Sequence, residues 1–235
     1  MRSFAVLVLL VSFNAFPAQH HQSESFVLAP GYGDLEFVLP GPGTYRLPVL
    51  GTAEDALVVN SLDQELSLHS LMASRFTLLS FIYTNCSDVN GCPVATYVMG
   101  RIQDRLKGDD ALKETVRLVS FSFDPENDTA EVLQQYASNF RNPGSDWHFV
   151  TSRIPEELKK ILSDYDQFVI LDIDENGKLL GSISHMLRVY LIDHNFKIRN
   201  IYSVSFLHPD TVINDIKTIM LDRAHNYLKT QKQDQ

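Results

Sequence analysis

The stretch that decides the fold is FTLLSFIY, residues 76–83. A continuous apolar run of this length predicts a strand that is buried on both faces of a sheet. A polar loop follows, and then Val94, Val98 and Ile102 recur at steps of four, as on the buried face of an amphipathic helix. Pro93 suits the first position of that helix. The sequence therefore predicts a buried strand, a loop and a helix in succession.

Strands and helices alternate further along the chain. The predicted elements are a strand at 116–123, a helix that begins with a capping box at Asp128–Glu131, a strand at 147–150, a helix at 155–165, hairpins formed by 168–173 with 178–183 and by 188–193 with 197–204, and a helix at 209–228. Helices alternating with the early strands predict a partly parallel sheet, and the hairpins predict antiparallel strands at one side. This order favours an α/β fold of thioredoxin-like architecture: a central mixed sheet flanked by helices, with extra hairpins.

The N-terminal part of the chain predicts export. One basic residue precedes an apolar run at 4–16, which is shorter than the roughly 20 residues that span a bilayer, and small residues follow. This is the pattern of a secretory signal at residues 1–18. We therefore expect an exported, periplasmic protein, anchored to the membrane if the signal is retained.

The rest of the chain divides into three parts. Residues 19–65 predict an extended Pro/Gly-rich lead-in with short strands such as 35–39, residues 66–228 the thioredoxin-like domain, and residues 229–235 a frayed tail. Hydrophobic residues at 44% and charged residues at 21% indicate an ordinary globular protein and exclude a disordered chain. The net charge of −9 argues against nucleic acid as a partner, because phosphate binding needs clustered Lys and Arg.

The chemistry is concentrated in the loop TNCSDVNGCP, which carries Cys86 and Cys92. A disulfide between them would close a very short loop and restrain little of the unfolded chain, which favours a chemical role. A helix N-terminus stabilises a nearby thiolate. The Asn90-Gly91 pair permits a tight turn that brings the sulfurs together. Soft sulfur ligands select Cu(I), and an imidazole broadens a site to Cu(II). His185, in a loop just before the strand RVYLID, is the best candidate for a third ligand, although a lone His is more often structural.

Three ordered motifs, FIYTNC with GCP, SFDPENDT, and SHMLRVYLID, resemble the SCO/SenC family of copper-binding thioredoxin-fold proteins. The resemblance spans about residues 66–220. It implies an exported protein that binds copper through Cys86, Cys92 and His185 and that helps to assemble the dinuclear copper centre of cytochrome c oxidase, or acts as a thiol reductant for it. Asp124 and Asp128 match the family's DPxxDT element. We expect Asp128 to cap a helix and Asp124 to support the site, to dock a partner, or to lie in a plain turn. The family's usual spacing is CxxxC, whereas this chain has CxxxxxC.

The sequence supports more than one function. The leading hypothesis is a copper metallochaperone that carries Cu(I) or Cu(II) to a client copper protein, such as a cytochrome oxidase subunit or a c-type cytochrome. One alternative is a thiol-disulfide reductase acting through Cys86 and Cys92, although the usual reductase motif is CxxC. Another is a binding module with a structural disulfide. A peroxidase is disfavoured because no activating Arg is evident beside Cys86.

Overall fold

The computed structural model describes residues 27–233, with side chains through residue 225. The predicted signal at residues 1–18 lies outside these residues. Among the helices in this range, none combines the length and the apolar character that a membrane crossing needs.

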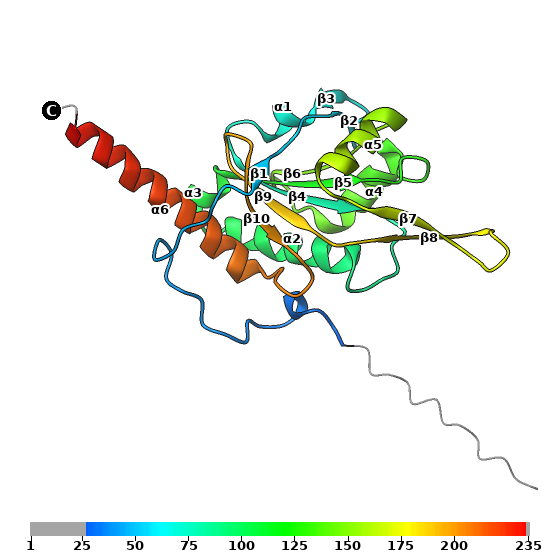
Figure 1. The fold of residues 1–235 in the computed structure, drawn as a ribbon, viewed down its shortest axis with the longest axis horizontal. Coiled ribbons are helices and arrows are strands. Elements are labelled where there is room, and N and C mark those ends of the chain that lie inside the picture. The colour runs from blue at the N-terminus through cyan, green and yellow to red at the C-terminus, as the bar shows by residue number, and fades with distance from the viewer. Residues whose placement is uncertain (1–26, 234–235) are drawn as a thin grey trace, which may run out of the picture.

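The body of the molecule is a mixed sheet in the order β1-β10-β9-β4-β5-β6-β2-β3 (Figure 1). Its centre is β4 (Phe76–Ile82), in which every residue is buried. β4 pairs in parallel with β5 (Val116–Ser122), and β5 pairs in parallel with β6 (Trp147–Thr151). On its other side β4 pairs antiparallel with β9 (Val189–Ile192). The predicted partly parallel sheet with antiparallel strands at one side is confirmed.

The two edges of the sheet recruit strands from the N-terminal lead-in. β1 (Gly51–Thr52) pairs with β10 (Lys197–Tyr202), while β2 (Leu57–Asn60) joins β6 and pairs with β3 (Glu65–Ser67). The sheet thus begins before residue 66. The strand expected at 35–39 does not form. Phe37 and Val38 are exposed there, and no neighbouring strand in the described part of the chain pairs with that segment.

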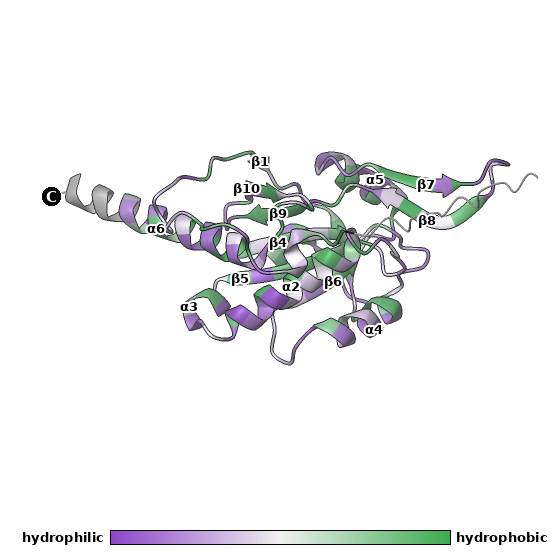
Figure 2. Ribbon diagram, turned by 90° about the horizontal axis from the view of Figure 1, so that it is seen from below, coloured by the Kyte–Doolittle hydropathy of each residue, from purple (hydrophilic) through white to green (hydrophobic). Residues whose placement is uncertain are grey.

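Helices cover both faces of the sheet. α2 (Cys92–Leu106), followed by the short α3 (Asp110–Lys113), connects β4 to β5, and α4 (Ala130–Phe140) connects β5 to β6. Right-handed crossovers in one direction place α2 and α4 on the same face. Figure 2 shows them there, with α5 (Pro155–Asp164) on the opposite face. The short α1 (Leu68–Met72) precedes β4.

The last helix, α6 (Pro209–Gln233), packs beside α2. It runs past residue 228, where the sequence prediction ended it, and includes most of the tail expected to fray. The residues KTQKQ at 229–233 contain no helix breaker, and Lys and Gln are good helix formers.

A hairpin of β7 (Val169–Ile173) and β8 (Leu179–His185) forms a separate two-stranded sheet that extends away from the body (Figure 1). Figure 2 shows apolar segments along both strands, and the exposed apolar side chains include Ile170, Leu171 and Leu180. His185 is the last residue of β8 and pairs with Val169. The expectation that it lies in a loop is wrong, because this pairing extends the ladder to the base of the hairpin.

Candidate metal centre

The two cysteines flank a loop at the carboxyl end of β4. Cys92 is the first residue of α2 and is 1% exposed, while Cys86 is half-buried. The backbone amide of Tyr83 donates to the sulfur of Cys92 over 3.4 Å. The Cys86 thiol faces the carbonyl oxygen of Asp88 at 3.9 Å. Both cysteines are free thiols.

His185 reaches the same place from the hairpin. Its Nε2 lies 3.8 Å from the sulfur of Cys92. The imidazole packs against Phe123, with ring centroids 4.8 Å apart, and meets the ring of Tyr83 nearly edge-on at 6.3 Å. The backbone amide of Ile183 donates to the Tyr83 hydroxyl over 3.3 Å. The end of β8 is thereby fixed against the end of β4, and the three residues singled out in the sequence come together.

The pKa values of the two thiols are shifted in opposite directions. A hydrogen bond from the Cys92 thiol lowers the pKa of Cys86 to about 6, because it stabilises the thiolate. Burial raises the pKa of Cys92. At neutral pH the pair therefore carries one negative charge, on the more exposed sulfur. Burial also lowers the pKa of His185, so its ring is neutral at pH 7 and keeps a free lone pair.

Tyr83 is a site residue that the sequence interpretation missed. It was read as the last member of the apolar strand, yet it contacts β8 through its hydroxyl and the sulfur of Cys92 through its amide. Burial raises the pKa of Tyr83 to about 12, so its hydroxyl stays protonated. Its position directly before a cysteine-bearing loop was the available signal.

Asp128 does not cap α4. The cap is Thr129, whose side chain accepts from the amide of Val132. Asp128 is instead fully buried and accepts hydrogen bonds from the amide of Thr84, the hydroxyl of Thr84 and the hydroxyl of Ser122. The Asp128 carboxylate thereby joins the end of β4 to the end of β5. Its contact on the β4 side, Thr84, lies two residues before Cys86. Sequence spacing alone did not distinguish Asp128 from its neighbour Thr129, since both residue types cap helices.

Asp124 lies in the turn that follows β5. Its carboxylate accepts two hydrogen bonds from the side chain of Asn127, at 2.9 and 3.1 Å, and its carbonyl accepts from the amides of Asn127 and Asp128. Asp124 also lines a cavity of about 530 Å³ together with Leu171 and Ile183 of the hairpin. These contacts close a turn and place Asp124 beside the hairpin rather than beside the thiols.

The donor set is chemically suited to a soft metal ion, because two sulfurs and a neutral imidazole favour copper. Cys86 and His185 line one cavity of about 280 Å³, together with Tyr83, Asp88 and Asp172. Within the described residues, no three His, Cys, Asp or Glu side chains converge closely enough to hold a metal ion as they stand. Three-donor binding therefore requires a rearrangement of these side chains.

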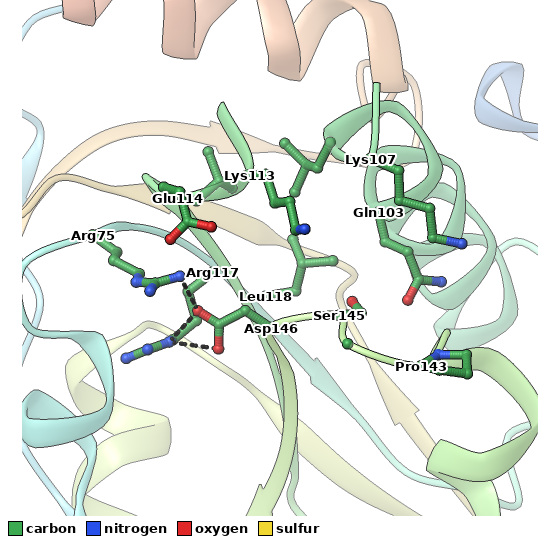
Figure 3. Close-up of a pocket in the computed structure, with 13 residues that line it drawn as sticks. Arg75, Gln103, Lys107, Lys113, Glu114, Arg117, Leu118, Pro143, Ser145 and Asp146 are labelled. Atoms are coloured by element: carbon green, nitrogen blue, oxygen red, sulfur yellow. Dashed lines mark hydrogen bonds and ion pairs between the residues drawn. The ribbon is translucent and has the colours of Figure 1, made fainter. Parts of the chain in front are cut away.

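A larger cavity, of about 550 Å³, lies at the opposite end of the central strands, where β5 begins. Figure 3 shows Arg75 and Arg117 converging on Asp146 there. The ion pairs measure 2.6 and 2.9 Å. Burial opposes the charge of Asp146, but a hydrogen bond from His148 and the Arg117 guanidinium hold the pKa of Asp146 below its usual range. The Asp146 carboxylate therefore has a structural role: it joins residues at the start of β4 and β5, far from the two thiols.

The model of the SCO1/SenC family matches residues 58–221. The chain belongs to this family. A SCO1 protein homolog from Bacillus subtilis is 28% identical over 156 residues, which are 66% of this chain and 76% of the relative. The match places the cysteine loop, the Asp128 turn and His185 inside the region that defines SCO1/SenC proteins.

Solved SCO structures share the fold. BsSco, described as a Sco family cytochrome c oxidase assembly protein with a disulfide switch, is 28% identical with a TM-score of 0.58 and covers 74% of this chain and 97% of its own. A SCO1/SenC lipoprotein from Bacillus anthracis is 27% identical with a TM-score of 0.59, over 72% and 95% of the two chains. Arabidopsis thaliana ScoI with copper bound is 20% identical with a TM-score of 0.61, over 73% and 99%. The expected thioredoxin-like α/β fold is confirmed.

Proposed function

We propose that this SCO1/SenC protein is an exported copper carrier that holds its cargo ion through Cys86, Cys92 and His185 and passes it to a client copper protein. The observation that carries the proposal is the 3.8 Å approach of the His185 imidazole to the Cys92 sulfur, beside a second thiol of low pKa. Copper bound to the related ScoI proteins of Arabidopsis thaliana and Bradyrhizobium japonicum supports the choice of metal.

Each donor has a separate task. Cys86 is half-exposed and ionised at neutral pH, so it receives the incoming ion. Cys92 is buried and protonated and releases its proton as its sulfur bonds to the metal. His185 is neutral and already beside Cys92, so it contributes a lone pair without proton loss. Cys86 is also the donor that an incoming client ligand displaces, because it faces the open cavity.

The client follows from the family. BsSco is described as a cytochrome c oxidase assembly protein, and we infer that an oxidase subunit, or a c-type cytochrome, receives the copper. The net charge of −9 would assist docking to a basic partner. Delivery outside the cytoplasmic membrane agrees with the predicted signal, and a retained signal would anchor the protein in the membrane.

A second function is favoured by the contrast in thiol acidity. The Cys86 thiolate can attack a client disulfide, forming a mixed disulfide and releasing one client thiolate. Cys92 then loses its proton and attacks the Cys86 sulfur, which releases the second client thiol. The client gains two electrons, and the Cys86–Cys92 pair ends as a disulfide. This reaction needs both sulfurs but not His185.

Copper(I) titration of the reduced protein against a chromophoric chelator separates the two functions. A carrier binds one copper per chain, loses it in Cys86→Ser and Cys92→Ser, and binds at least about tenfold more weakly in His185→Ala, because removing a ligand costs at least as much as removing a residue that supports one.

His225→Ala is the matched control, since His225 is exposed on α6. If His185→Ala binds copper as tightly as His225→Ala does, the three-donor site is wrong. Reduction of a client disulfide by His185→Ala at the parent rate would then support the reductase.

A further inference from the structure

The loop that carries both thiols is held by residues 27–32, which we name the strap. The side chain of Asn90 binds the strap backbone with both of its polar atoms. Its Oδ1 accepts from the amide of Ala29 over 2.7 Å, and its Nδ2 donates to the carbonyl of Val27 over 2.9 Å. Asn90 thus pairs with the strap much as a neighbouring strand would.

A second contact lies one residue earlier in the loop. The hydroxyl of Tyr32 donates to the carbonyl of Val89 over 2.6 Å. The Tyr32 ring packs against Tyr97 of α2, with centroids 5.0 Å apart. One aromatic side chain therefore joins the loop to the helix that follows it.

The strap itself is closely packed on the body. Pro30–Tyr32 forms one turn of 3-10 helix, and Gly31 is buried in it. A Cβ added at Gly31 would lie 2.4 Å from the carbonyl oxygen of Leu207 and 2.8 Å from Val98. This close approach admits only glycine at position 31, so the docked position of the strap depends on that residue.

The loop has little else to fix it. Ser87, Asp88 and Val89 are exposed. Two hydrogen bonds inside the loop, from the amides of Asn90 and Gly91 to Asp88, form a local turn. Within the described residues, the hydrogen bonds from residues 87–91 to distant parts of the chain all lead to the strap. Val89 and Asn90 lie in the stretch that is two residues longer than the family's usual spacing.

We propose that the strap is part of the metal site, and that Tyr32 and Asn90 are positioning residues that hold the lengthened cysteine loop in order before copper arrives. The part of this inference that concerns copper rests on the proposed function. Without the strap contacts the free loop samples other conformations, and the apparent affinity for copper falls by the fraction of chains that remain competent. The same freedom lets the two sulfurs approach to bonding distance, which favours the disulfide.

The test compares Tyr32→Phe and Tyr97→Phe in the full chain. Each substitution removes one phenol hydroxyl and keeps the ring, but the Tyr97 hydroxyl contacts Arg101 rather than the loop. For Tyr32→Phe we expect faster amide exchange across residues 86–91 and about fivefold weaker copper(I) binding, the effect of one net hydrogen bond. We also expect about a fivefold shift towards the disulfide at equilibrium with oxidised glutathione, which is reduced as the pair is oxidised. Asn90→Ala removes two contacts and should exceed Tyr32→Phe in all three measurements.

The strap inference is overturned if Tyr32→Phe and Asn90→Ala match Tyr97→Phe in amide exchange, or if exchange rises while copper affinity and the disulfide equilibrium both stay at the parent values. If the parent binds no copper, the proposed function fails. The positioning role of the strap is then tested by amide exchange and by the disulfide equilibrium, because neither measurement needs a metal.

Discussion

The backbone amide of Thr84 donates a 3.0 Å hydrogen bond to the carboxylate of Asp128, 44 residues further along the chain. The Thr84 hydroxyl donates to the same carboxylate. Because Asp128 is fully buried, these contacts cannot be replaced by water. Thr84 is the first residue of the cysteine loop, so the bond fixes where that loop leaves β4, just as the strap fixes its far side.

We expect Asp128→Ala to lower the free energy of unfolding by about 2–4 kcal/mol, because it leaves buried donors of Thr84 and Ser122 without an acceptor. Urea unfolding measures the change. Asp124→Ala is the control and should cost less than about 1 kcal/mol, since the Asp124 carboxylate accepts only from the exposed Asn127 side chain. Equal losses in the two variants would show that the Asp128 contacts do not support the fold.

Alkylation should separate the two thiols. The thiolate is the reactive form, and the pKa of Cys86 is lowered to about 6 while that of Cys92 is raised. Iodoacetamide should therefore label Cys86 first, at a rate that rises with pH to a plateau above about pH 7. Mass spectrometry of the labelled peptides checks this.

Cys92→Ala provides the control for the cause of the shift. Loss of the donating thiol should move the Cys86 midpoint upward, towards the ordinary thiol value of 9.0. A midpoint that stays near 6 in Cys92→Ala would assign the acidity to the helix N-terminus instead.

Two glycines should respond in opposite directions to alanine. Gly31→Ala forces a Cβ against the Leu207 carbonyl and Val98 and should destabilise the protein by about 1–3 kcal/mol. Gly100 lies inside α2, and an added Cβ there would meet nothing within 4 Å beyond its chain neighbours and its own helix backbone, so Gly100→Ala should stabilise the protein by about 0.5–1 kcal/mol. Thermal unfolding of both variants gives the sign, and a neutral Gly31→Ala would mean that the strap is not docked.

The ion pairs of Asp146 should make the stability of the fold depend on pH in the acid range. Its pKa is lower in the folded protein than its ordinary value of 3.8, so its charge stabilises the fold above about pH 4, and the contribution is lost as pH falls through the folded pKa. Asp146→Asn should cost about 1–2 kcal/mol at pH 7, and the difference from the parent should shrink in strong acid. A constant difference down to pH 2 would contradict this assignment.

The sequence predicted the central strands and helices well, because 76–83 is an apolar run of strand length, 116–123 is mostly apolar, and α2 repeats its apolar residues at helical spacing. It predicted the cysteine pair and His185 as candidates from chemistry and from family resemblance. Strands as short as Gly51–Thr52 have no measurable period, and they form because a longer strand offers a free edge.

The contacts that organise the site were not predictable in this way. Asn90 meets Ala29 across 61 positions, and Asp128 meets Thr84 across 44. Neither pair leaves a local pattern, since each side chain satisfies a backbone group that tertiary packing brings to it. Asp128 and Thr129 both resemble helix caps, and only the burial of the carboxylate distinguishes them.

The adjacency of β4 and β9 has a consequence for biogenesis. The sulfurs leave the sheet from β4, while the imidazole arrives just ahead of β9, 93 positions beyond Cys92. A polypeptide interrupted after α5 would carry both thiols and no ring to join them. The proposed three-donor site therefore becomes complete only once the C-terminal part of the chain has folded onto β4.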